Sequence, residues 1–159
     1  MFANRGFGFI ELLVAVSIIV TMTLGIVRIQ MMSLEATEFS MQYRQASLLI
    51  YEIVSSMRAN QDAVRKNDYN ITTSTINAPT NCISGQCNPS QWATFQLFNW
   101  QTWARSQLPQ GRIEIFCDKN CESGQEIVIS IIWQPKAPRA SSDCTSDDTF
   151  YCLQEIVEL

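Results

Sequence analysis

The chain begins with a long apolar stretch from Phe7 to Val27, in which Glu11 is the single charged residue. At a rise of about 1.5 Å per residue, a helix of this length crosses a hydrocarbon core about 30 Å thick. The stretch is too long for the apolar core of an ordinary secretory signal peptide. The pattern therefore predicts a membrane-spanning helix, which we place at residues 7–29.

After residue 30 the apolar pattern changes but stays helical. Residues 30–66 contain neither Gly nor Pro, and apolar side chains recur three or four positions apart in Ala46, Leu49 or Ile50, Ile53 and Met57. This stripe is typical of an amphipathic helix that packs through one face. We expect one helix from about Phe7 to Val64, whose second half continues as an amphipathic segment over 30–66.

The remaining segment, 67–159, has the pattern of a small α+β head. Residues 67–90 are rich in Asn, Thr and Ser and predict a loop, after which Asn88-Pro89 marks the start of a helix. Runs at 112–117, 126–133 and 150–159 then predict strands. The predicted fold class is α+β, with the long N-terminal helix packed against a small antiparallel sheet of three or four strands.

The helix that starts at Asn88 is unusually aromatic. Its apolar stripe is flanked by Trp92, Phe95 and Trp103. Aromatic side chains at this density can stack on sugars or bases, but large side chains packed in a core are the simpler interpretation.

Composition and charge exclude several functions. The net charge is −4, from 11 basic and 15 acidic residues, and no basic patch is present, which argues against nucleic-acid binding. Histidine is absent, which removes Ser-His-Asp and Cys-His catalysis. The sequence also lacks a glycine-rich phosphate-binding loop. We therefore expect no enzymatic activity and no cofactor.

Six cysteines are candidates for disulfide bonds, and all lie in the second half of the chain: Cys82, Cys87, Cys117, Cys121, Cys144 and Cys152. An even number outside the membrane segment indicates an oxidising compartment. Connectivity is open from the sequence, and we favour the local pairs 82–87, 117–121 and 144–152, each of which closes a short polar loop. The need for an oxidising compartment also places the head on the non-cytoplasmic side. Arg5 and Arg28, one on each side of the apolar stretch, determine the orientation only weakly.

Metal binding is the less favoured use of these residues. The Cys82–Cys87 and Cys117–Cys121 spacings are conceivable halves of a zinc site, but an oxidising compartment favours disulfides. Asp143, Asp147 and Asp148 are conceivable calcium ligands, although their spacing matches no known calcium loop. We predict no metal site.

Glu11 lies four residues inside the apolar run, where an ionised acid costs about 2.5–3.5 kcal/mol at the bilayer centre. Three interpretations are open. The carboxylate reaches the headgroups, or it pairs inside a helical bundle. Alternatively, it neutralises a positive charge created later, such as a new amino terminus at Phe7.

The residues around Glu11 carry a family resemblance. Arg5-Gly6-Phe7-Gly8-Phe9-Ile10-Glu11, followed by Leu12-Leu13-Val14-Ala15, resembles the class III signal of type IV prepilins. The resemblance implies that residues 1–6 are a leader, that prepilin peptidase cuts between Gly6 and Phe7, and that the Phe7 amine is methylated. It also implies a type IV pilin-like fold, a filament-core role for residues 7–29, and docking guided by Glu11.

Two positions depart from the usual signal. Many family members have Thr or Ser where this chain has Gly8, and Leu where it has Phe9. Neither departure affects the glycine before the cut or the acid. The apolar segment also lacks the proline that many major pilins carry, so a kink there is not implied.

The rest of the chain resembles a pilin subfamily. Met57-Arg58-Ala59-Asn60, the Trp-rich helix, Leu108-Pro109-Gln110-Gly111 and the strand ending in Trp133 resemble the minor pilin called PilV. This resemblance implies a low-abundance subunit that helps prime pilus assembly near the tip. The implied partners are prepilin peptidase, other minor pilins, the major pilin and a tip adhesin. The implied location is the bacterial inner membrane with a periplasmic head, and then the pilus at the cell surface.

Two alternatives remain. A pseudopilin of a type II secretion system has the same N-terminal signal. A membrane-tethered ligand-binding domain that never polymerises would lack processing at Gly6 and would use its aromatic side chains to bind a ligand.

Overall fold

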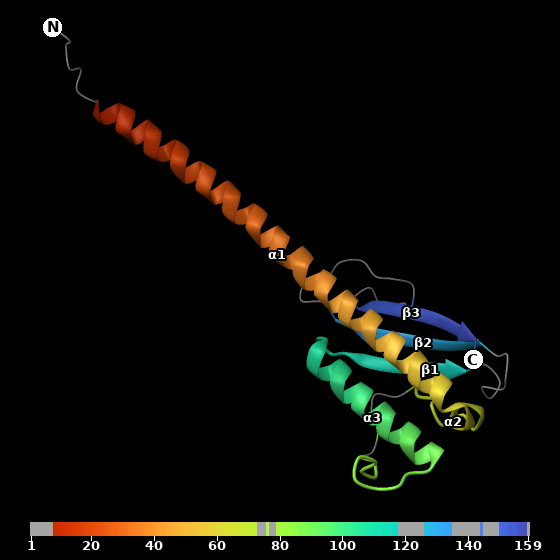
Figure 1. Cartoon of the computed structure of the whole chain (residues 1–159). Helices are drawn as coiled ribbons and strands as arrows, with labels where there is room; N and C mark the ends of the chain where they lie inside the picture. Colours follow the sequence, from red (N-terminus) through yellow and green to blue (C-terminus); the bar gives the residue numbers. More distant parts are fainter. Residues whose placement is uncertain are drawn as a thin grey trace. The chain divides into compact units, whose positions relative to one another are not determined.

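The computed structural model describes residues 8–72, 76, 79–117, 126–134, 144 and 150–158. The chain forms two compact units, Met1–Ser40 and Met41–Leu159. The first helix, α1 (Phe9–Ala59), contributes its N-terminal part to the first unit and its C-terminal part to the second (Figure 1).

The expectation of one helix reaching Val64 is wrong at its C-terminal end. Helix α1 ends at Ala59, and a separate short helix α2 (Gln61–Arg65) follows Asn60. The backbone of Asn60 has φ −126° and ψ 54°, which is outside the helical region. Its side-chain nitrogen donates to the Tyr69 hydroxyl at 3.1 Å and the Pro89 carbonyl at 2.9 Å. These bonds to residues beyond the helix accompany the break that local propensity did not reveal.

The second unit contains a three-stranded antiparallel sheet in the order β1 (Arg112–Cys117), β2 (Glu126–Trp133), β3 (Tyr151–Glu158). The expected strands and the expected α+β class are confirmed, with three strands among the described residues. The predicted loop after α2 contains one further pairing, in which Ile71 bridges Ile115 at the outer edge of β1.

The core of this unit lies between the C-terminal part of α1, helix α3 (Pro89–Gln107) and the sheet. The predicted stripe of α1 is buried, with Ala46, Ile53 and Met57 fully inaccessible. It meets the isoleucines that point inward from β1 and β2, because alternate positions of a strand lie on one face. Periodicity therefore predicted this core correctly.

Helix α3 begins where the sequence predicts. The Asn88 side chain accepts from the Gln91 amide at 2.8 Å, and the Gln91 side chain accepts from the Asn88 amide at 3.1 Å. This reciprocal capping box satisfies two backbone donors that a helix start leaves unpaired, and Pro89 has no such donor to satisfy.

The turn from α3 to β1 requires a glycine. A Cβ added to Gly111 would lie 2.3 Å from the carbonyl oxygen of Ala104, far inside contact distance. The preceding residue, Gln110, has φ 52°, in the left-handed region. The absence of a side chain at Gly111 thus lets the chain turn tightly against the end of α3.

Disulfide bonds join Cys82 to Cys87 and Cys144 to Cys152, as the local pairing predicts. Cys117 is also disulfide-bonded. Its predicted partner, Cys121, lies outside the described residues, so that pair stays a prediction.

Candidate functional site

Glu11 lies in the first turn of α1. The carbonyl oxygen of Gly8 accepts hydrogen bonds from the amides of Glu11 at 3.0 Å and Leu12 at 3.4 Å, which closes that turn. The N-terminal end of a helix carries a partial positive charge, and a carboxylate in the first turn is stabilised by it. The helix therefore compensates in part for an acid at the start of an apolar segment.

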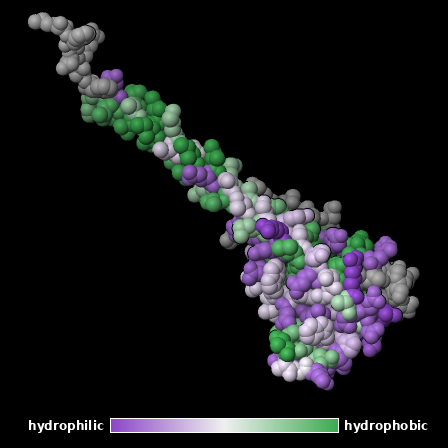
Figure 2. Space-filling model, viewed as in Figure 1, coloured by the Kyte–Doolittle hydropathy of each residue, from purple (hydrophilic) through white to green (hydrophobic). Residues whose placement is uncertain are grey.

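The apolar segment from Phe9 to Val27, which contains Glu11, has exposed apolar side chains on all sides, and no other described part of the chain is packed on it. The most exposed side chains are Phe9 at 79% and Ile10 at 76%. The same exposure continues along the helix at Leu12, Leu13, Val14, Val16, Ile18, Ile19, Val20, Met22, Leu24, Ile26 and Val27. Figure 2 shows this apolar surface covering the N-terminal part of α1. By length and composition, this helix can cross a membrane.

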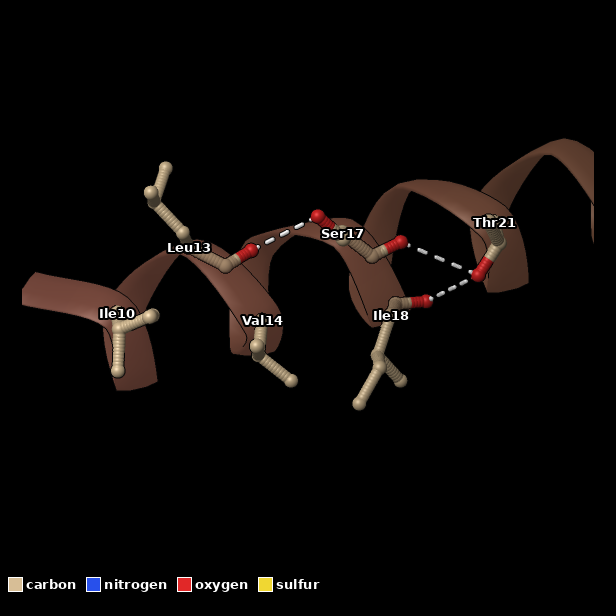
Figure 3. Close-up of a pocket in the computed structure, with 6 residues that line it drawn as sticks. All are labelled: Ile10, Leu13, Val14, Ser17, Ile18 and Thr21. Carbon is tan, nitrogen blue, oxygen red and sulfur yellow. Dashed lines mark hydrogen bonds between the residues drawn. The ribbon is translucent and has the colours of Figure 1, made fainter.

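The few polar side chains of this segment bond to their own helix. The Ser17 hydroxyl donates to the Leu13 carbonyl at 2.8 Å. The Thr21 hydroxyl donates to the carbonyl of Ile18 at 2.9 Å and to that of Ser17 at 3.2 Å (Figure 3). Such internal bonds remove the cost of taking a hydroxyl out of water. The segment can therefore enter lipid or a bundle of helices without an unsatisfied hydroxyl at these positions.

A shallow groove of about 340 Å³ follows one side of this helix, lined by Ile10, Leu13, Val14, Ser17, Ile18 and Thr21. Figure 3 shows that all of these residues come from consecutive turns of α1. The groove is therefore the surface of a single helix, suited to lipid tails or to the side chains of another helix.

Charge pairing does not involve Glu11 within the described part of the chain, where ion pairs join Arg65 to Asp62 and Arg112 to Glu114. The predicted cleavage residues, Gly6 and Phe7, lie outside the described residues. Their cleavage, the methylation of Phe7 and the role of Glu11 therefore stay predictions.

The head contains polar contacts of buried indoles that the sequence did not indicate. The Trp133 indole donates to the Gln42 side chain at 3.1 Å, and the Trp100 indole donates to Glu52 at 3.1 Å. Both bonds tie α1 to elements far along the chain. A search for apolar periodicity treats Gln42 as a surface position, so this anchor was missed.

The described residues offer no arrangement for metal chemistry. Among them, no group of three or more His, Cys, Asp or Glu side chains is placed to hold a metal ion. The cysteines of the conceivable zinc half-site at Cys82 and Cys87 are joined to each other. The conceivable calcium ligands, Asp143, Asp147 and Asp148, lie outside the described residues.

Comparison with known families matches a part of the chain beyond the N-terminal signal. A family model described as Tt1218-like, type IV pilin Tt1218, matches residues 28–98. This chain is similar to type IV pilins. No curated protein and no solved structure matches it.

The matched residues do not overlap the prepilin-like signal at Arg5 to Ala15. They include the distal part of α1, the Cys82–Cys87 loop and the start of α3. Two separate parts of the chain thus resemble pilins, and the α+β fold with its long apolar helix is consistent with the pilin fold. The likeness of residues 28–98 to type IV pilins accompanies a helix that is long and apolar enough to cross a membrane.

Proposed function

We propose that this protein is a minor type IV pilin, made with a leader at residues 1–6 and cut by prepilin peptidase between Gly6 and Phe7. The observation that carries the proposal is the presence of one acid, Glu11, in the first turn of an apolar helix that nothing in the described chain covers. A surface of this kind needs lipid or other subunits around it. The match of a separate segment to type IV pilins favours lipid around the helix first and other subunits around it after assembly.

The role of Glu11 follows from charge and distance. A cut before Phe7 creates an ammonium group four residues away, and four residues are about one helical turn. An ionised acid in the bilayer centre costs about 2.5–3.5 kcal/mol, and a nearby cation reduces that cost. Methylation of the amine keeps its charge, so the modified amine of one subunit pairs with Glu11 of a neighbour as the helix leaves the lipid.

The head faces the periplasm in this proposal, because its disulfides need an oxidising compartment. After assembly it lies on the pilus at the cell surface. The resemblance to PilV supports a low-abundance subunit that primes assembly near the tip, beside other minor pilins, the major pilin and a tip adhesin. A pseudopilin has the same N-terminal signal, so the filament that contains the protein distinguishes the two.

The first experiment measures the N-terminal mass of the protein from its native membrane, with and without prepilin peptidase. We expect a chain that begins at methylated Phe7 only when the peptidase is present. Substitution of Gly6 should block the cut, whereas Gly8→Ser, which introduces a residue common in the family and meets no atom within 4 Å of its Cβ, should not. An unprocessed chain in both strains would overturn the assignment and favour a tethered domain.

The second experiment tests assembly. Glu11→Ala should leave membrane insertion intact and reduce the amount of this subunit in sheared pili. Glu35→Ala is the matched control, because Glu35 is an exposed acid on the same helix beyond the apolar segment. Equal incorporation of both variants would refute the role of Glu11, and recovery from a secretion pseudopilus instead of a pilus would identify the protein as a pseudopilin.

A further inference from the structure

A pocket of about 400 Å³ lies in the head, between the end of α1 and the start of α3, and is lined by Ser55, Ser56, Ala59, Asn60, Cys87, Pro89, Trp92 and Gln96. This volume falls in the range of about 300–1,000 Å³ that small-molecule sites occupy. The Cys82–Cys87 disulfide closes the loop on one side, so a covalent link holds that part of the rim.

Trp92 differs from the tryptophans of the core. Trp100 and Trp133 are buried, and their indole nitrogens donate to acids or amides of α1. Trp92 is 39% exposed, and its indole makes no hydrogen bond to the described residues. Phe95 packs against it, with ring centroids 5.7 Å apart. The structure thus presents a braced aromatic surface at the pocket and not a core side chain.

Two amide side chains are held beside this surface by the buried Tyr69. The Tyr69 hydroxyl accepts from the Asn60 nitrogen at 3.1 Å and donates to the Gln96 oxygen. The nitrogen of Asn60 and the oxygen of Gln96 are therefore already hydrogen-bonded. The Asn60 oxygen and the Gln96 nitrogen make no hydrogen bond to the described residues, and they supply one acceptor and one donor in fixed positions.

Two hydroxyls complete the polar part of the pocket. Most helical Ser and Thr side chains here donate to a carbonyl one turn earlier, as Ser47 does to Tyr43 at 2.9 Å. Ser55 and Ser56 make no such bond within the described chain and line the pocket instead. Their donors and acceptors are therefore available to a ligand.

The charge of the pocket narrows the ligand class. None of the eight residues that line it carries a charge. An anionic ligand would find no cation among them, and the net charge of the protein, −4, opposes it as well. An aromatic face beside uncharged amides and hydroxyls matches a molecule with one apolar C–H face and several hydroxyl groups.

We propose that this pocket binds a neutral carbohydrate, with one pyranose ring stacked on Trp92 and its hydroxyls bonded to Asn60, Gln96 and Ser56. This function is independent of filament assembly, because none of these residues belongs to the apolar segment. A protein partner is less suited to the pocket, because an apolar side chain placed there would leave the amides and hydroxyls unpaired.

The test uses the full chain in a detergent without a sugar headgroup, since a maltoside would compete. The probes are the methyl glycosides of glucose, galactose, mannose and N-acetylglucosamine, measured by saturation-transfer NMR and by protection of tryptophan fluorescence from acrylamide. We expect binding of at least one probe, about tenfold weaker in Trp92→Ala. Glucose 6-phosphate should bind more weakly than the neutral glucoside.

Two further variants separate binding from folding. Gln96→Glu keeps the oxygen that accepts from Tyr69 but removes the free N–H donors, so it should weaken binding at an unchanged unfolding midpoint. Phe116→Ala removes an aromatic side chain that is more exposed than Trp92, 50% on β1 against 39%, and should bind like the wild type. Trp92→Phe should retain part of the affinity if Trp92→Ala proves unstable.

Three results would overturn the proposal. The first is the absence of any bound probe, and the second is equal loss of binding in Trp92→Ala and Phe116→Ala. The third is self-association of the protein through Trp92 without sugar binding, which would assign the pocket to a second copy of the chain.

Discussion

The two ends of α1 are both helical but place their apolar side chains in opposite environments. In the first unit the apolar side chains point in all directions and are exposed, as at Leu24, which is 64% exposed. In the second unit they form one stripe, and Ile53 is fully buried against the head. The same secondary structure therefore serves two purposes, because a stripe matches one partner inside the chain, whereas an all-round apolar surface needs partners outside it.

The largest expected effect tests the buried half. Ile53→Ala should lower the free energy of unfolding of the head by about 2–5 kcal/mol, because it removes buried carbons and leaves a cavity. Leu48→Ala, a comparable truncation at a side chain that is 59% exposed, should change it by no more than about 0.5 kcal/mol. Chemical denaturation followed by tryptophan fluorescence measures both. Equal effects would mean that the stripe does not form the core.

The second largest effect concerns membrane insertion of the exposed N-terminal part of α1. Ile18→Arg places a charge within the apolar segment and should cost about 2.5–3.5 kcal/mol on membrane insertion. The fraction of protein resistant to carbonate extraction measures it. Leu48→Arg, on the same helix within the second unit, should insert normally. Normal insertion of Ile18→Arg would show that the segment does not sit in lipid.

A pair of glycines sharpens the contrast. Gly111→Ala should destabilise the head by about 1–3 kcal/mol, because the new Cβ would meet the Ala104 carbonyl. Gly25→Ala, in the first unit, meets nothing within 4 Å and should leave head unfolding unchanged. It should also favour the helix slightly, since Ala is the better helix former. A stable Gly111→Ala head would show that the turn relaxes without cost.

The smallest effect concerns pH. Burial raises the pKa of the Tyr69 phenol above its ordinary value of 10.0, the Asn60 hydrogen bond lowers it in part, and the Asp68 charge raises it further. The unfolded chain therefore loses this proton first as the pH rises. Above about pH 10 the unfolded state binds fewer protons, so stability falls with pH.

The stability that the raised pKa of Tyr69 contributes is fully present below about pH 10 and is lost as the pH rises through the pKa of the folded state. Tyr69→Phe, which cannot ionise, should show a shallower loss of stability between about pH 10 and pH 12 than the wild type. Unfolding midpoints measured across this range test the difference. Identical pH profiles would show that Tyr69 ionises normally in the folded head.

Strong local patterns predicted most of the elements. The period of 3.6 in α1, the Asn88-Pro89 start of α3 and the alternation in β1 and β2 all appear in the structure as predicted. The break at Asn60 was not predictable in this way. It coincides with hydrogen bonds to Tyr69 and Pro89, which follow Asn60 by 9 and 29 residues and lie outside the helix.

The sequence by itself determined the apolar anchor, the prepilin-like signal around Glu11, the even set of cysteines and the α+β class. These are encoded in local periodicity and spacing, which need no knowledge of the folded chain. Only the tertiary structure decided that Gln42 and Glu52 bond buried indoles, and that Ser56, Asn60, Trp92 and Gln96 line one pocket. Residues from different elements meet through packing, and no local pattern records which of them will become neighbours.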